Sequence, residues 1–147
     1  MTVALRRCAG NDLDAATLYD LLRLRVEVFV IEQACPYPEL DGLDLLPGTE
    51  HFWLENVRGE VISTLRLMQE PGLFRIGRVC TEAGERGHGL TARLMQAALA
   101  EVGDRPCELN AQSYLADMYA RHGFTPAGPE FLEDGIPHIP MRREGRP

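Results

Sequence analysis

The spacing of apolar and polar residues predicts strands and helices that alternate along the chain. Residues 3–8 favour a short strand, and a helix begins near Asp14, where apolar side chains start to recur at helical intervals. The predicted inward face of this helix consists of Leu18, Leu21, Leu22, Arg25, Val26 and Phe29. Strand-forming residues then predict a β-meander over 51–57, 60–68 and 74–81, with a hairpin turn at 56–59.

The second half of the chain predicts more elements of both kinds. A helix runs to about Val102, with an inward face of Leu90, Leu94, Ala98, Leu99 and Val102. After it come a strand at 107–111, a short helix at 113–122, and a closing hairpin with its turn at 133–135. Residues 34–50 hold three prolines and two glycines, which predicts a long loop of the kind that is often functional. The order indicates a mixed α/β fold of the α+β type, with a mostly antiparallel sheet flanked by helices.

Length and composition suit a single domain spanning residues 1–147, because 147 residues with 45% hydrophobic content can enclose a full core. No run approaches the roughly 18 apolar residues that cross a bilayer, and the N-terminus lacks a secretory pattern. We therefore expect a cytoplasmic protein with no membrane partner. The net charge of −7 disfavours nucleic acid as a partner and mildly favours a cationic substrate.

The spacing of cysteines and histidines argues against a metal site. Cys8, Cys35, Cys80 and Cys107 lie far apart and form no CxxC pair. The four histidines show no metal-ligand spacing such as H-x-x-x-H. We expect reduced, mostly buried thiols and no bound metal.

A glycine-rich segment between a predicted strand and a predicted helix is the most informative motif. It consists of Arg86, Gly87, His88, Gly89, Leu90 and Thr91. Glycines let the backbone turn sharply and approach a ligand, and the first amides of the following helix have no internal partner. These donors, together with the positive end of the helix dipole, favour a phosphate group. A glycine-rich turn without a ligand is the alternative.

Two known phosphate-binding patterns compare poorly with this segment. A Walker loop needs Lys followed by Ser or Thr after its second glycine, whereas Gly89 precedes Leu90 and Thr91. A dinucleotide fingerprint is a closer rival, since residues 87–92 fit G-x-G-x-x-A and Glu108 stands near the place of a ribose-binding acid. Topology disfavours it, because three strands and a hairpin precede the motif and fewer than 40 residues follow the next strand.

Several separated motifs together resemble the GNAT acyltransferase superfamily. An Arg-Gly-x-Gly junction follows a β-meander and precedes a strand and the segment Tyr119, Ala120, Arg121, His122, Gly123 and Phe124. The resemblance covers nearly the whole chain. Further segments are similar to the ElaA-like branch: residues 29–33, Cys35 to Tyr37, Asp41 with Gly42, and 133–138.

The resemblance implies a sheet splayed between its fourth and fifth strands, with acetyl-CoA as co-substrate in the gap. The pantetheine arm would pair with the backbone of Val79, Cys80 and Thr81. Amides of the segment from Arg86 through Thr91 would hold the pyrophosphate, and a strand amide would serve as oxyanion donor. Two departures stand out: the superfamily usually has Gly or Ala in place of Thr91, and Asn in place of Gln112, a residue expected to contact CoA.

Acyl transfer to an amine needs a proton donor for the thiolate and a route for the amine's proton. Tyr119 matches the tyrosine that many of these enzymes direct at the CoA sulfur, and packing against Phe124 is its structural alternative. Glu32 and His51 are candidate bases, although an ion pair or cap for Glu32 and a strand-edge role for His51 are as compatible with the pattern. His138 has the same standing as these two. A water chain without a dedicated base would also suffice.

Charged residues outside these motifs favour an interpretation as solvated groups. Arg66, Arg75 and Arg78 on the strands are interpreted as solvated or sheet-face charges. The acids of the long loop are interpreted as solvated: Glu39, Asp41, Asp44 and Glu50. The same acids are an alternative lining for a cationic acceptor site.

These observations lead to an acetyl-CoA-dependent N-acetyltransferase that transfers the acetyl group to a primary amine by direct attack in a ternary complex. The acceptor is a small molecule or a peptide whose identity stays open, as does the oligomeric state. A non-catalytic acyl-CoA-binding sensor is the alternative from another functional class, followed by the dinucleotide-binding domain.

Overall fold

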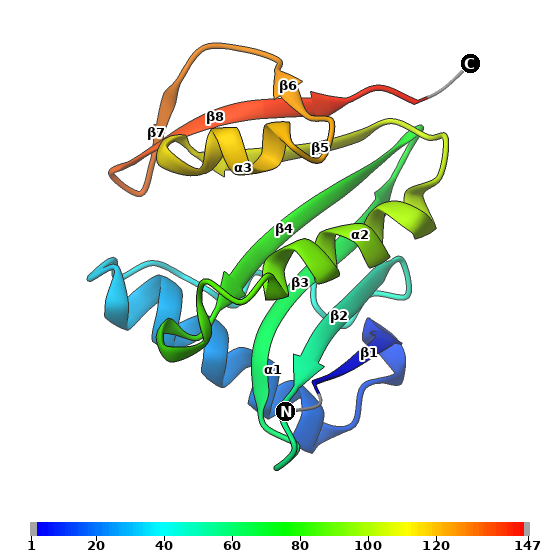
Figure 1. The fold of residues 1–147 in the computed structure, drawn as a ribbon, viewed down its shortest axis with the longest axis vertical. Helices are drawn as coiled ribbons and strands as arrows, with labels where there is room; N and C mark the ends of the chain where they lie inside the picture. The colour runs from blue at the N-terminus through cyan, green and yellow to red at the C-terminus, as the bar shows by residue number, and fades with distance from the viewer. Residues whose placement is uncertain (1–2, 146–147) are drawn as a thin grey trace.

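The computed structural model describes residues 3–145, which form one eight-stranded sheet with helices on its faces (Figure 1). The strands are β1 (Ala4–Ala9), β2 (Thr49–Glu55), β3 (Val61–Glu70), β4 (Leu73–Thr81), β5 (Cys107–Gln112), β6 (Thr125–Pro126), β7 (Phe131–Glu133) and β8 (Ile136–Arg143). The longer helical elements are α1 (Ala15–Arg25), the π-helical segment η2 (Val26–Glu32), α2 (Leu90–Val102) and α3 (Ala116–Ala120). Single 3-10 turns are η1 (Gly10–Asp12), η3 (Ala83–Glu85) and η4 (Ser113–Leu115).

The sheet runs in the order β1-β2-β3-β4-β5-β8-β6, with β7 on β8, and its β4–β5 pair is parallel. That pair is short: only Phe74 with Cys107 and Arg75 with Glu108 are in register. Beyond these residues β4 and β5 diverge, so the sheet opens into a V (Figure 1). The predicted mixed, mostly antiparallel sheet with its splay is confirmed.

A β-bulge bends β4 at the point where it leaves β5. Thr64 and Arg66 of β3 pair with Cys80 and Gly77, so β4 has one residue more than β3 over this stretch. Within it, Arg78 has φ of +53°, a left-handed conformation that a non-glycine residue seldom adopts. A bulge of this kind increases local twist and redirects the strand, and such bulges often lie beside functional sites.

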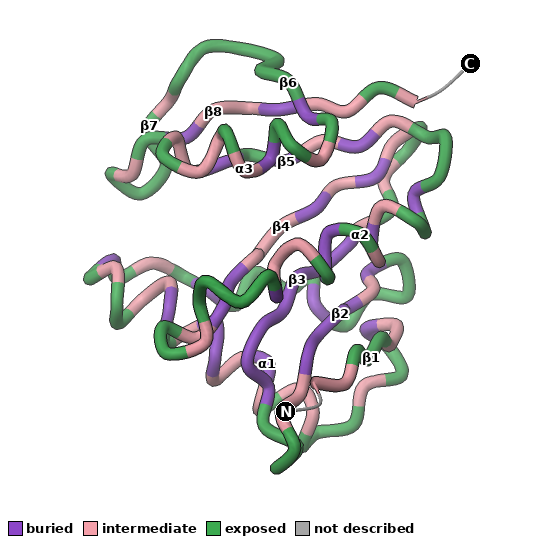
Figure 2. The backbone as a smooth tube through the Cα atoms, in the orientation of Figure 1, coloured by how far each residue is buried: buried purple, intermediate pink, exposed green. Residues whose placement is uncertain are grey.

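Helices cover both faces of the central strands, which explains why β2 and β3 are buried along most of their length (Figure 2). Successive residues of a strand point to opposite faces. Phe52 and Leu54 therefore join the core under α2, while Trp53 lies between them in the smaller core under α1. The inward face of α2 is as predicted at four positions, but Leu99 is only partly buried.

The first helix begins as expected and ends differently. Asp14 caps α1 by accepting a hydrogen bond from the Thr17 amide at 2.7 Å. After Arg25 the chain continues in the wider π pitch of η2, which changes the angular spacing of side chains. The predicted inward face is partly wrong: the buried residues are Leu21, Leu24, Arg25 and Val28, while Leu18, Leu22, Val26 and Phe29 are half-buried. The change of pitch accounts for Val26 and Phe29, which lie in η2.

The cysteines fit the expectation of thiols rather than disulfides. All four are free; Cys35, Cys80 and Cys107 are buried, and Cys8 is partly exposed. Between residues 3 and 145, no helix has both the length and the apolar character to span a membrane.

Candidate active site

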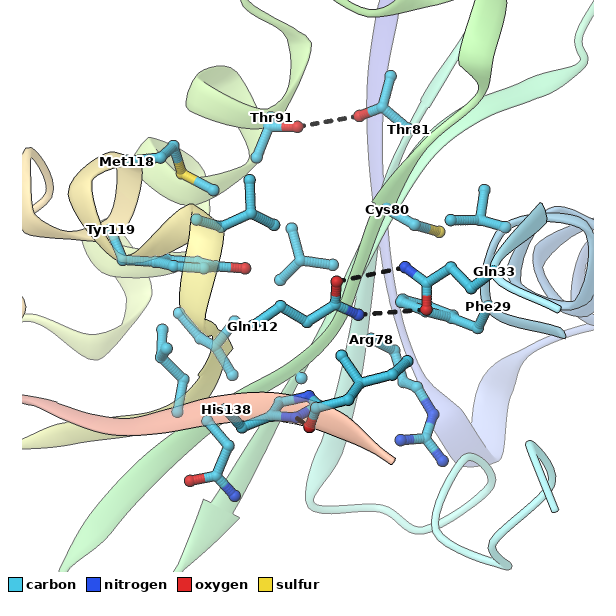
Figure 3. Close-up of a pocket in the computed structure, with 18 of the residues that line it drawn as sticks. Phe29, Gln33, Arg78, Cys80, Thr81, Thr91, Gln112, Met118, Tyr119 and His138 are labelled. Atoms are coloured by element: carbon cyan, nitrogen blue, oxygen red, sulfur yellow. Dashed lines mark hydrogen bonds between the residues drawn. The ribbon is translucent and has the colours of Figure 1, made fainter. Parts of the chain in front are cut away.

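A cleft of about 920 Å³ occupies the V between β4 and β5. Its walls come from η2 and the loop after it, the outer half of β4, the turn before α2, the end of β5, η4 with α3, and the β7–β8 hairpin. Figure 3 shows side chains from these elements directed into the same space. Its volume lies within the range of small-molecule and cofactor sites.

The β4 edge brings a stretch of backbone without a β5 partner to this cleft. The last pairing with β5 is at Arg75, so Val79, Cys80 and Thr81 have no β5 partner on that side. All three line the cleft. Burial raises the pKa of the Cys80 thiol to about 12, so this side chain stays a neutral thiol and the strand contributes its backbone.

The turn from residue 86 to residue 91 brings amides to the other side of the cleft. Gly87 and Gly89 have φ of +83° and +74°, values that glycine adopts without strain. Gly89 is the N-cap of α2 and provides no side-chain cap, so the first amides of the helix remain available. The predicted anion cradle thus has the expected backbone shape, while the His88 side chain is exposed and contacts the Glu85 carbonyl at 3.1 Å.

The Arg86 side chain is already engaged. Its Nε donates to the Thr81 carbonyl at 3.0 Å, and its two terminal nitrogens donate to the Glu32 carboxylate at 2.7 and 2.8 Å. This bidentate pair lowers the pKa of Glu32. Arg86 therefore brings an amide rather than a free cation to the cradle, and Glu32 is better suited to an ion pair than to general-base catalysis.

Thr91 stands where the superfamily usually has Gly or Ala, and its hydroxyl makes specific contacts in the structure. Its hydroxyl lies 2.9 Å from the Thr81 hydroxyl (Figure 3). The Thr81 hydroxyl in turn lies 2.7 Å from the Ser63 hydroxyl. Ser63 also donates to the Cys80 carbonyl at 3.2 Å. This chain of hydroxyls joins the first turn of α2 to β3 and β4, so Thr91 fixes the cradle against the strand edge.

Tyr119 packs in the core and also faces the cleft. Its ring packs edge-to-face on Phe124 with centroids 6.4 Å apart, and Figure 3 shows its hydroxyl directed into the cleft. Burial raises the pKa of this phenol, so the hydroxyl keeps its proton at neutral pH. A neutral phenol can donate a hydrogen bond or a proton.

Gln112 reaches across the cleft to Gln33, a residue that the sequence alone did not single out. The two side-chain amides exchange hydrogen bonds of 3.3 and 3.2 Å, shown as dashed lines in Figure 3. Gln112 ends β5 and Gln33 follows η2, so the pair links the two sides of the V. The larger side chain of Gln, compared with Asn, supplies the reach for this contact.

His51 lies outside the cleft. It is 1% exposed, and its Nε2 lies 2.8 Å from the Asp44 carbonyl. Burial lowers the pKa of His51, with the contact to Asp44 opposing the shift. The candidate base His51 is therefore a structural residue, because the β2 strand directs it at the long loop instead of at the cleft.

The interpretation of the long-loop acids as solvated is wrong for Glu39 and Asp44, which are buried. Arg25, itself 1% exposed, donates to Asp44 and to Glu39, both at 2.7 Å. Arg66 is also buried and donates to Asp44 at 3.0 Å and to Asp41. Charged groups are rarely buried without partners, and these are paired with one another.

Arg78 extends this network to the bulge. It donates to Glu39 at 2.6 Å and lies 5.6 Å from the centre of the Tyr37 ring. Although burial alone would raise the pKa of Asp44, Arg25 and Arg66 hold it below its usual value. Arg66 likewise lowers the pKa of Asp41. Arg75 and Glu50, by contrast, form partly exposed pairs with other partners.

The comparisons with known proteins agree with this geometry. Residues 23–144 match the family described as Acetyltransferase (GNAT) domain. This chain belongs to the GNAT acetyltransferase family. Proteins of this family use acetyl-CoA as co-substrate, and an acyl group passes from its thioester to an acceptor.

Relatives narrow the position of the chain within the GNAT family. The UPF0039 protein Rv2851c of Mycobacterium tuberculosis is 64% identical over 99% of this chain and 96% of its own length. Protein ElaA of Escherichia coli is 37% identical over 91% and 92%. The ElaA-like resemblance is confirmed.

Solved structures of GNAT proteins show the same fold. An acyl-CoA N-acyltransferase from Pseudomonas aeruginosa superimposes with a TM-score of 0.91 at 42% identity, covering 97% of this chain and 99% of that one. The crystal structure of Escherichia coli ElaA gives a TM-score of 0.91 at 33% identity, covering 97% and 100%.

Proposed function

We propose that this chain is an acetyl-CoA-dependent N-acetyltransferase in which a primary amine attacks the thioester directly within a ternary complex. The observation that carries the proposal is the convergence of three features on one cleft. These are an unpaired strand edge, a turn of free amides, and the neutral phenol of Tyr119. The first two would bind the CoA thioester, and the third would donate a proton to its sulfur.

The residues that would hold acetyl-CoA lie along the strand edge and the turn. The pantetheine amides would pair with the backbone of Val79, Cys80 and Thr81 as an added strand, a mode of recognition that free strand edges favour. The pyrophosphate would lie on the amides of residues 86–91, where the positive end of α2 stabilises negative charge. Gln112 would exchange its contact with Gln33 for one with the pantetheine arm.

The chemistry would divide between the strand and the phenol. A β4 amide near Cys80 would donate to the carbonyl oxygen as the carbon becomes tetrahedral, which is the kind of stabilisation that often contributes most to acyl transfer. Tyr119 would give its proton to the sulfur as the C–S bond breaks. Burial raises the pKa of this phenol, so the hydroxyl carries a proton at neutral pH and can donate a hydrogen bond to the sulfur as the thiolate forms.

Two measurements test the proposal. Acetyl-CoA at about 100 times its dissociation constant should stabilise the protein by roughly 2.7 kcal/mol in thermal unfolding, and NAD should leave it unchanged. Release of CoA thiol is then followed with a library of primary amines. Binding without thiol release from any amine would support an acyl-CoA sensor instead, and stabilisation by NAD alone would contradict both.

A further inference from the structure

One end of the cleft is built from the loop after η2 and the β7–β8 hairpin. Cys35 of the loop donates its thiol to the Asp134 carbonyl in the hairpin turn at 3.5 Å, so the two segments touch. Tyr37 and His138 line the cleft from these two sides. The Gln33–Gln112 pair separates this end from Tyr119 in the view of Figure 3. An acceptor that meets a thioester near Tyr119 would lie here.

His138 is placed in this end by strand pairing. It lies opposite Gln112 in the antiparallel β5–β8 ladder, and residues directly opposite each other share a face of the sheet. Since Gln112 crosses the cleft, His138 is on the cleft side as well (Figure 3). The residue is only 8% exposed, and its ring stacks on Phe131 with centroids 5.8 Å apart.

The hydrogen bond made by Nδ1 of His138 determines which nitrogen of the neutral ring carries the proton. Nδ1 of His138 lies 2.7 Å from the Ile136 carbonyl oxygen, which can only accept, so Nδ1 carries the proton. In the neutral ring, Nε2 therefore holds a lone pair. The charged group nearest to it is the Glu133 carboxylate at 3.5 Å. Both groups are hydrogen-bond acceptors, so a positively charged donor lying beside the pair would donate to both.

The charges around this pair favour such a donor. Two arginines of the cleft lining are neutralised: Arg78 of β4 by Glu39 and Asp41, and Arg86 of the turn before α2 by Glu32. Arg121, which follows α3, lines the cleft as well. Gln112, which faces His138 from β5, carries no charge. Glu133 is 51% exposed at the entrance, and its one ion contact among residues 3–145 is with His138. Glu133 therefore places a negative charge at this entrance, where an ammonium ion would meet it.

We propose that Nε2 of His138 takes the proton from the acceptor amine, and that Glu133 selects acceptors that arrive as primary ammonium ions. The proposal rests on the proposed function. The ammonium gives one proton to Nε2, the free amine attacks the thioester carbon, and a C–N bond forms as the C–S bond breaks. Tyr119 protonates the departing sulfur and regains a proton from the amine nitrogen through solvent. The net products are the amide, CoA thiol and one proton, which His138 returns to solvent.

The first test replaces His138 by Asn, whose side-chain amide can still donate to the Ile136 carbonyl but has no basic nitrogen. At pH 7 kcat should fall about 100-fold, the lower end of the effect of a general base, with KM for acetyl-CoA unchanged. The pH profile of the variant should differ from the native profile, because the group that accepts the proton of the amine has been removed. His122→Asn, at a histidine outside the cleft lining, is the matched control. A kcat within twofold of native with the native pH profile would overturn the assignment.

The second test separates selection from proton transfer. Glu133→Gln should raise KM for a primary alkylamine about 10-fold with little change in kcat, and should leave KM unchanged for hydroxylamine, which is neutral at pH 7. Glu130→Gln, an exposed glutamate just before β7, is its control. Equal effects on both nucleophiles would overturn the role of Glu133.

A readout independent of turnover completes the design. Nitrogen-15 spectra, with the His138 signals assigned through the Asn variant, should show the neutral ring protonated at Nδ1. Protonation at Nε2 instead would overturn the inference while leaving the proposed function intact. Absence of thiol release by the native protein with every amine would overturn both together.

Discussion

The two sides of the cleft are stabilised in different ways: buried ion pairs stabilise the loop at residues 34–48, and apolar contacts stabilise β5, α3 and β8. The buried carboxylates of the loop at residues 34–48 form ion pairs with Arg25 and Arg66. The loop itself buries very few apolar side chains. The opposite side, formed by β5, α3 and β8, is held by the core that includes Leu109, Tyr119 and Phe124. The charged side shapes the acceptor end, and the apolar side supports the phenol proposed for chemistry. The two sides should therefore respond differently to substitution and to pH.

Removing a charge from the first side should have the largest effect. Arg25→Met leaves Glu39 and Asp44 buried with less compensation, so the free energy of unfolding should fall by about 3–5 kcal/mol. Arg23→Met, two residues away on the same helix, breaks only a partly exposed pair with Glu27 and should cost less than about 1 kcal/mol. Urea unfolding measures both. Equal losses would show that the buried network contributes no more than a surface pair.

On the second side, a substitution should change chemistry without changing stability. Tyr119→Phe keeps the ring that packs on Phe124 and removes only the hydroxyl in the cleft. We expect kcat to fall about 100-fold or more, while the free energy of unfolding changes by less than about 1 kcal/mol. Tyr19→Phe, at an exposed tyrosine on α1, serves as control. A kcat that is unchanged across pH would remove Tyr119 from the mechanism.

Acid should weaken the charged side selectively. Arg66 lowers the pKa of Asp41 in the folded protein, so Asp41 stabilises the fold above its unfolded pKa of about 3.9 and loses this effect as the pH falls toward the folded pKa. Asp41→Asn should therefore cost on the order of 1–2 kcal/mol at pH 7, and the difference from native should narrow below about pH 4. Urea unfolding from pH 7 to pH 2.5 tests this, with the exposed Asp12→Asn as control. A difference independent of pH would contradict it.

The contact that joins the two sides should have the smallest effect. Gln33→Ala and Gln112→Ala in a double-mutant cycle should show a coupling of about 0.5–1 kcal/mol in unfolding without acetyl-CoA. A parallel cycle of Gln112→Ala with Gln96→Ala, an exposed residue on α2, should be additive. No coupling between Gln33 and Gln112 would mean that the reciprocal hydrogen bonds do not stabilise the closed arrangement.

Most of the correct predictions from the sequence concern features that neighbouring residues determine. The strands of the meander, the start of a helix near Asp14 and the turn through Gly87 and Gly89 depend on a few neighbouring residues, and each is found in the structure. The errors at charged residues concern partners distant along the chain. Arg66 and Asp44 are 22 residues apart, so their polarity alone indicated exposure, although each makes the burial of the other possible.

In the candidate site, too, the features found in short segments were predictable, and the contacts between distant residues were not. The cradle and Tyr119 belong to motifs that are visible in short segments. Gln33 and Gln112 are 79 residues apart, and their contact depends on how the V closes. His51 has the chemistry of a base, but β2 directs it toward the loop, and only the sheet topology determines that direction.

The π-helical segment η2 gives the chain a sensitivity to length rather than to composition. Its wider turns bond Gln33 to the Val28 carbonyl and Cys35 to the Val30 carbonyl, each five residues back. A π-helical residue turns the chain by less than the roughly 100° of an α-helical residue, so the seven residues of η2 turn the chain about as far as six would in an α-helix. Deleting one residue between 26 and 32 would therefore restore α-helical pitch and leave Glu32 and Gln33 directed at their partners. A second deletion would rotate the end of the segment by about 100° relative to α1, which stays on the sheet through Leu21 and Leu24. The segment can thus lose one residue, but not two, before the polar rim of the cleft separates from the scaffold.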